Sequence, residues 1–97
     1  MQFLVVITLN SSANEEVRKE HAADIWGYQK TGVIRTVYTT PSPFKPGNEV
    51  LIFEAPGIDK LRELVSGLTF VRKGLANGTV TPLSAYLNYN EYFCPVR

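Results

Sequence analysis

The sequence predicts an α+β domain in which two helices cover one face of a four-stranded antiparallel sheet. Strand-like and helix-like segments follow one another in the order strand, helix, strand, strand, helix, strand. These segments occupy most of the 97 residues, with no internal repeat, low-complexity tract or linker between them. Because this order is that of the ferredoxin-like βαββαβ layout, we expect one such domain over residues 1–97.

The first half of the chain supplies one strand and one helix. Residues 2–9 are aliphatic, β-branched or aromatic with no turn former, which indicates a strand with apolar groups on both faces. Ser12 and Glu15 have the spacing of a capping box, so a helix is predicted over 14–31, with Gly32 as its stop. At steps of three and four, its inward stripe consists of Val17, His21, Asp24 or Ile25, and Tyr28.

The second half supplies the remaining strands and a second helix. Residues 33–39 and 49–55 are rich in β-branched and aromatic residues, and a loop with three prolines joins them. Such a loop is either a rigid surface connection or the border of a pocket. A helix is predicted from Ile58 to about 66–68, and a strand over 78–87 that contains Pro82. Residues 88–97 form a tail that we expect to pack on a partner subunit.

Apolar residues on both faces of the sheet predict an oligomer. A chain of 97 residues buries only roughly 60–65% of its unfolded surface, which leaves a lone monomer marginally stable. Each apolar side chain left wet on the uncovered face would lose about 1.5–3 kcal/mol. We therefore expect two sheets to pack face to face as a dimeric α+β barrel, in a homodimer or higher homo-oligomer.

The charge and cysteine inventory excludes several classes of function. Ten basic and nine acidic residues give a net charge of +1, so we expect no nucleic-acid partner. The apolar run near the start is too short for a membrane span or a secretory leader. A single cysteine, Cys94, cannot form an internal disulfide, and neither a phosphate loop nor a metal-ligand cluster is present. We expect no cofactor, no metal, no membrane partner and a cytoplasmic location.

Three charged or titratable residues are candidates for chemistry. His21, the only histidine, lies on the inward stripe of the first helix and could transfer a proton, with Asp24 three residues later holding its tautomer. Arg35 lies in an otherwise uncharged strand and could bind a carboxylate or an enolate oxygen. The alternatives are a histidine that only packs and an arginine that reaches water at the sheet rim.

Aromatic residues are candidates for lining a ligand cavity. We expect Tyr28, Tyr38, Trp26 and Phe53 to bind substrate, although such residues more often belong to the core. Cys94 has no histidine beside it in the sequence and is a weak candidate for a nucleophile.

A group of positions from 19 to 84 resembles a known family. These positions are Gly32 after the first helix, Arg35 and Tyr38 in the second strand, Phe53-Glu54-Ala55-Pro56, and Leu68-Thr69-Phe70. The segment resembles muconolactone isomerase and its relatives among the dimeric α+β barrels. The resemblance implies a cofactor-independent enzyme that isomerises a small unsaturated lactone or related cyclic carboxylate by proton transfer.

Two other functions stay open on the same fold. One is a cofactor-free monooxygenase or cyclase that acts on a polyketide-like aromatic molecule. The other is a non-catalytic module for ligand binding or assembly, in which His21 and Arg35 tolerate replacement.

Overall fold

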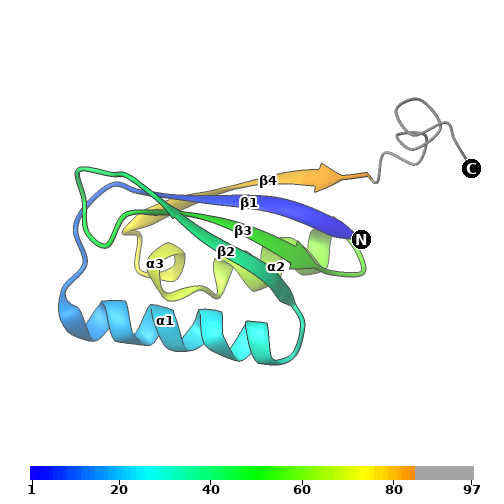
Figure 1. The fold of residues 1–97 in the computed structure, drawn as a ribbon, viewed down its shortest axis with the longest axis horizontal. Coiled ribbons are helices and arrows are strands. Elements are labelled where there is room, and N and C mark those ends of the chain that lie inside the picture. Colours follow the sequence, from blue (N-terminus) through cyan, green and yellow to red (C-terminus); the bar gives the residue numbers. More distant parts are fainter. Residues whose placement is uncertain (85–97) are drawn as a thin grey trace, which may run out of the picture.

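One antiparallel sheet of four strands, in the order β2-β3-β1-β4, carries all three helices on one face (Figure 1). The strands are β1 (Gln2–Leu9), β2 (Ile34–Thr40), β3 (Asn48–Glu54) and β4 (Ala76–Leu83). This computed structural model describes residues 1–84. The ferredoxin-like prediction is confirmed, whereas the predictions for the tail, for Cys94 and for a fourth strand reaching residue 87 fall outside the described residues.

The long helix α1 (Glu15–Lys30) begins at a different cap from the one predicted. Asn14 is the N-cap residue, and its side-chain oxygen accepts a hydrogen bond of 2.9 Å from the Val17 amide. The Ser12 hydroxyl accepts instead from the Lys45 amide at 3.0 Å, so the expected capping box does not form. Asn14 caps the helix in place of Ser12, whose hydroxyl is bonded to Lys45 in a loop distant in sequence.

The second helix, α2 (Ile58–Ser66), is followed by a single helical turn, α3 (Thr69–Arg72), within a segment expected to be an irregular connection. Gly67 ends α2, and the backbone amides of Arg72 and Lys73 bond to the carbonyls of Leu68 and Thr69. None of the described helices is long and apolar enough to cross a membrane.

The core lies between the sheet and the helices. Phe3, Val5, Ile7, Leu51 and Phe53 point to this side and are fully buried. Alternate residues of the same strands therefore supply the core, as the two-residue period of a strand requires.

None of the helices in residues 1–84 lies on the opposite face of the sheet. The centre of that face is apolar, because Leu4 pairs with Ile52 and Val6 pairs with Val50, and all four are only partly buried. We call this surface, with the exposed Tyr38 beside it, the open face. The sequence correctly placed apolar side chains on both sides of β1 and β3.

The proline-containing loop after β2 is fastened to the segment before α1. Besides the contact between Lys45 and Ser12, the Ala13 amide donates to the Lys45 carbonyl at 3.1 Å, and Asn48 accepts from the Leu9 amide at 2.9 Å. These bonds support the interpretation as a rigid connection.

Candidate functional site

A buried pair of titratable side chains joins α1 to β3. Nε2 of His21 lies 2.6 Å from Oε1 of Glu49, and only 3% and 11% of the two side chains are exposed. The inward stripe of α1 places His21 over the sheet, and Glu49 shares the core-facing side of β3 with Leu51. The sequence therefore correctly placed His21 inside the protein.

The second ring nitrogen of His21 is also bonded. The Phe70 amide donates to Nδ1 at 3.2 Å, and the imidazole stacks on the Phe70 ring with centroids 3.7 Å apart and planes 2° apart. Because Nδ1 accepts a hydrogen bond, the proton of the neutral ring lies on Nε2, which donates to Glu49. The imidazole is thus held in one tautomer and one orientation.

Asp24 lies one helical turn after His21 and binds a different residue. Its Oδ2 accepts from the Thr69 amide at 3.0 Å and from the Thr69 hydroxyl at 2.5 Å. Asp24 and His21 together accept the first two amides of α3, which have no partner inside that helix. The structure thus gives His21 a different carboxylate from the one expected: Glu49 binds the imidazole, and Asp24 anchors α3.

Sequence reasoning missed Glu49 because it lies 28 residues from His21. One signal was present in the strand: Glu49, Leu51 and Phe53 alternate on the side that forms the core, so a carboxylate at position 49 had to face inward. A buried carboxylate needs a partner, and the inward histidine was a candidate.

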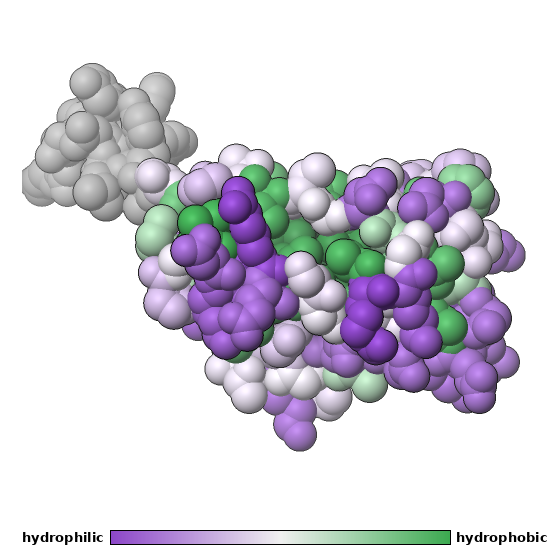
Figure 2. Space-filling view, turned by 180° about the vertical axis from the view of Figure 1, so that it is seen from behind, coloured by the Kyte–Doolittle hydropathy of each residue, from purple (hydrophilic) through white to green (hydrophobic). Residues whose placement is uncertain are grey.

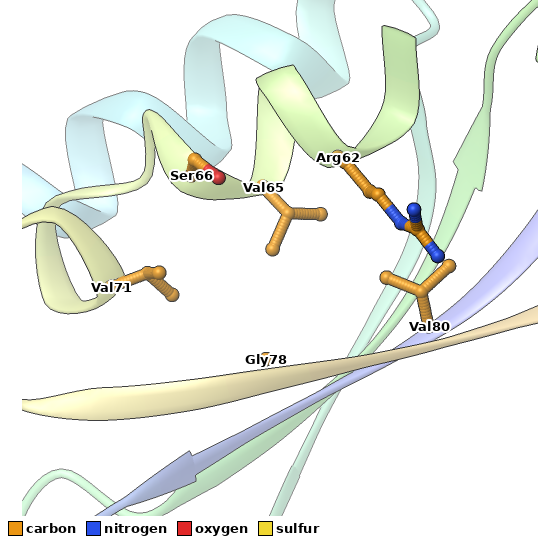
Figure 3. A pocket seen from close by; sticks show the side chains of 6 residues that line it. All are labelled: Arg62, Val65, Ser66, Val71, Gly78 and Val80. Atoms are coloured by element: carbon orange, nitrogen blue, oxygen red, sulfur yellow. The ribbon is translucent and has the colours of Figure 1, made fainter. Parts of the chain in front are cut away.

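A cavity of about 380 Å³ lies between α2, α3 and β4 (Figure 3). Gly78 lies at its floor, and the side chains of Val65 and Val71 point into the space above Gly78. Val80, Arg62 and Ser66 complete the lining. None of the site residues predicted from the sequence lines this cavity.

The cavity and the His21–Glu49 pair lie in one row across the sheet. Ile7 of β1 is the strand partner of Glu49 on one side and of Gly78 on the other. At about 4.8 Å between neighbouring strands, the backbones of Glu49 and Gly78 are roughly 10 Å apart. The Ile7 side chain and the α3 turn therefore separate the cavity from the His21–Glu49 pair. In α3, Phe70 stacks on His21, and Val71 lines the cavity.

Arg35 lies at an irregularity of β2, between Ile34 and Thr36, and is exposed. A Cβ atom on Gly32 would lie 3.9 Å from its Nη1, so the guanidinium sits at the end of α1. Glu49 lies opposite Thr39 of β2. Arg35 is four residues before Thr39, so its backbone is about 13 Å along the strand from the position opposite Glu49. The structure does not bring Arg35 and His21 together.

The four aromatic candidates are divided between core and surface. Tyr28 packs edge-to-face on the fully buried Phe53, with ring centroids 6.2 Å apart. Trp26 and Tyr38 are 62% and 60% exposed, Trp26 on α1 and Tyr38 on the open face. Only Tyr28 and Phe53 lie together. Within residues 1–84, no group of three or more His, Cys, Asp and Glu side chains is placed to hold a metal ion.

Comparison with known proteins identifies the fold. No protein-family model matches the chain, and no curated protein matches its sequence. Muconolactone isomerase superposes with a TM-score of 0.73 over 89% of this chain and 91% of its own, at 14% sequence identity. The 5-chloro-2-hydroxyhydroquinone dehydrochlorinase of Burkholderia phenoliruptrix AC1100, in complex with 2,5-dihydroxybenzoquinone, superposes with a TM-score of 0.61 over 87% of this chain and 94% of its own, at 19% identity. The resemblance predicted from the sequence is confirmed at the level of the fold.

Proposed function

We propose that this protein is a cofactor-independent enzyme that shifts a proton within a small unsaturated lactone or related cyclic carboxylate, as muconolactone isomerase does. The observation that carries the proposal is the His21–Glu49 pair, two hydrogen-bonded titratable groups enclosed by the core. Paired, buried acid and base groups are concentrated at sites of proton transfer. By their names, both solved proteins of the same fold act on small cyclic molecules.

Glu49 is the group that we propose to meet the substrate. Both ring nitrogens of His21 already have partners, whereas the second carboxylate oxygen of Glu49 has none among the described residues. The Glu49 side chain is also the more exposed of the two. His21, for which the sequence predicted the role of the base, therefore acts through Glu49 as a positioning residue.

The proposed reaction needs no second reactant. The Glu49 carboxylate takes a proton from a carbon conjugated with the lactone carbonyl, and the electron pair of that C–H bond moves into the conjugated system to form a dienolate. The protonated Glu49 then returns the proton to another carbon of the dienolate. The carboxylate is restored and the double bond has moved.

Two roles predicted from the sequence carry over in altered form. Asp24 positions α3, whose Phe70 holds the imidazole. Arg35 stays the predicted partner of a substrate carboxylate, and to meet a ligand at Glu49 its side chain must turn away from Gly32.

We propose that a second copy of the chain covers the open face. Leu4, Val6, Val50 and Ile52 are the strand-paired residues at its centre. Because they are already partly buried, a matching sheet would recover for each of them a fraction of the about 1.5–3 kcal/mol of a fully buried side chain. This assembly is the dimeric α+β barrel predicted from the sequence.

Deuterium exchange tests the proposed reaction. The protein is incubated in heavy water with a panel of unsaturated γ-lactones, and the products are followed by NMR. We expect the double bond to move, with deuterium at the carbon that accepts the proton to the extent that protonated Glu49 exchanges with heavy water, and turnover at least a hundred-fold slower with Glu49→Gln. Glu54→Gln, at a half-buried position of the same strand whose carboxylate pairs with the N-terminal amine, is the control.

Lack of isomerisation across the panel, or equal turnover with Glu49→Gln, would contradict the isomerase. Oxygen consumption during turnover of an aromatic substrate would instead select the monooxygenase. Release of an unchanged ligand, with His21 and Arg35 variants binding it equally well, would select the binding module.

A further inference from the structure

We propose that the cavity between α2, α3 and β4 binds a small organic monoanion, with an apolar ring against the side chains of Val65, Val71 and Val80 and its carboxylate on Arg62 (Figure 3). The Ile7 side chain and the α3 turn separate this cavity from the His21–Glu49 pair. The cavity can therefore bind a ligand whether or not the protein catalyses the proposed isomerisation.

Gly78 lies at the floor of the cavity, where its neighbours leave no room for a side chain. A Cβ atom at this position would lie 2.9 Å from Cγ1 of Val65 and 3.3 Å from Cδ1 of Ile7. Any other residue would therefore force Val65 or Ile7 to move. The missing side chain lets Val65 and Ile7 pack close to the backbone of residue 78, which gives this end of the cavity an apolar surface.

The volume of the cavity and its valine walls favour a ligand with an apolar ring. About 380 Å³ exceeds the ~150 Å³ of an apolar cavity that holds one benzene molecule, and it falls within the ~300–1,000 Å³ of ligand sites. Val65, Val71 and Val80 form three of its walls. Hydrophobic surface is also visible between projecting hydrophilic side chains in the view from behind (Figure 2).

The charge at the cavity selects an anion. Arg62 extends from α2 across Val80, and it takes part in none of the ion pairs formed within the described chain. None of the six lining residues is acidic. A guanidinium binds a carboxylate through two parallel N–H donors, so Arg62 can hold one carboxylate by itself.

One carboxylate is matched by this arrangement, and two are not. Arg62 is the only charged residue of the lining, so a second carboxylate would be placed against valine side chains. The ligand class is therefore an apolar monocarboxylate of about one ring.

The test uses the full chain of 97 residues and benzoate as the probe, with neutral benzamide of the same shape as comparator. Titration at low ionic strength is followed by ¹H–¹⁵N NMR, because screening by salt weakens exposed charge pairs. We expect benzoate to shift the amide signals of Ser66, Val71 and Gly78, and to bind about ten-fold more tightly than benzamide.

Two variants separate the charge from the apolar walls. Arg62→Gln should reduce the affinity for benzoate about ten-fold and leave that for benzamide unchanged, whereas Val80→Phe should weaken both by filling the space. Lys60→Gln is the matched control, because it removes the same charge from the same helix at a residue that does not line the cavity.

Three results would overturn the proposal. These are equal affinity for benzoate and benzamide, equal effects of Arg62→Gln and Lys60→Gln, or signal shifts confined to residues outside the cavity. Loss of turnover with Glu49→Gln while benzoate binding persists would show that the reaction and this binding site are independent.

Discussion

Nε2 of His21 lies 2.6 Å from Oε1 of Glu49, across 28 residues of sequence and inside the core. The same imidazole accepts the Phe70 amide through Nδ1 and stacks on the Phe70 ring. A side chain held by three contacts in different directions cannot rotate without breaking one of them. The pair therefore links α1, β3 and α3 at one point.

The tautomer of His21 can be observed directly. We expect the ¹⁵N spectrum of the neutral ring to show a protonated Nε2 and an unprotonated Nδ1, because Nδ1 accepts the Phe70 amide. His21 is the only histidine, so both signals belong to it, and their couplings to the ring carbon protons distinguish Nδ1 from Nε2. A proton on Nδ1 in the neutral ring would contradict the described geometry.

Substitutions of the two partners of the buried pair, His21 and Glu49, should lower the free energy of unfolding by different amounts. His21→Ala leaves the Glu49 carboxylate buried without its donor and should lower the free energy of unfolding by about 3–5 kcal/mol. Glu49→Gln keeps an oxygen that can accept from Nε2, so its loss should be about 1 kcal/mol. Urea unfolding followed by circular dichroism measures both values. Equal losses would contradict the pairing.

Asp24 should stabilise the fold through α3. Asp24→Ala removes two hydrogen bonds to Thr69, one of them to a buried backbone amide, and should cost about 2 kcal/mol. In a double-mutant cycle with Thr69→Val, we expect a coupling energy of about 1 kcal/mol. Glu20→Ala, an exposed carboxylate of α1 that pairs with Arg72, should change stability by less than about 0.5 kcal/mol. Additive effects of the Asp24 and Thr69 changes would argue against the anchor.

A methyl group at position 78 should strain the structure around the cavity. Because the new Cβ would lie 2.9 Å from Cγ1 of Val65, Gly78→Ala should lower the free energy of unfolding by about 1–3 kcal/mol. Gly78→Ala should cost less stability when it is added to Val65→Ala than when it is added to the wild type, because the clashing Cγ1 of Val65 is then absent. A Gly78→Ala protein as stable as the wild type would show that this part of the core adapts freely.

The open face should control assembly. Ile52 pairs with Leu4 at the centre of this face, so a charge introduced by Ile52→Asp would be buried against the partner sheet. We expect sedimentation to show an oligomer for the wild type and a monomer for Ile52→Asp. Thr8→Asp, on the same face of β1 but exposed, is the control. A wild-type chain that is monomeric at micromolar concentration would refute the dimer.

Arg35 tests the weakest part of the proposed site. If Arg35 binds the substrate carboxylate, Arg35→Gln should raise KM about ten-fold with little change in kcat, because the contact would exist in both ground and transition states. Arg18→Gln on α1 provides a matched loss of charge. An unchanged KM would leave Arg35 as an arginine that reaches water at the rim of the sheet, which was the alternative open from the sequence.

Local patterns in the sequence predict the order and the type of the main elements. The runs of β-branched, aliphatic and aromatic residues in β1 and β3 and the helical stripe through His21 and Ile25 are such patterns, and they predict strands and helices directly. The same patterns predicted that His21 points inward and that the sheet has a second apolar face. Both follow from which side of an element a residue occupies.

Which side chains meet depends on how the elements pack, and no local pattern predicts it. Asp24 is close to His21 in sequence, yet Glu49 binds the imidazole, because packing of α1 over β3 sets that distance. The same packing assigned Ser12 to Lys45 instead of to the helix cap. The cavity over Gly78 also has no local signal, because the space lies between residues of α2, α3 and β4 that come together only when the helices close over the sheet.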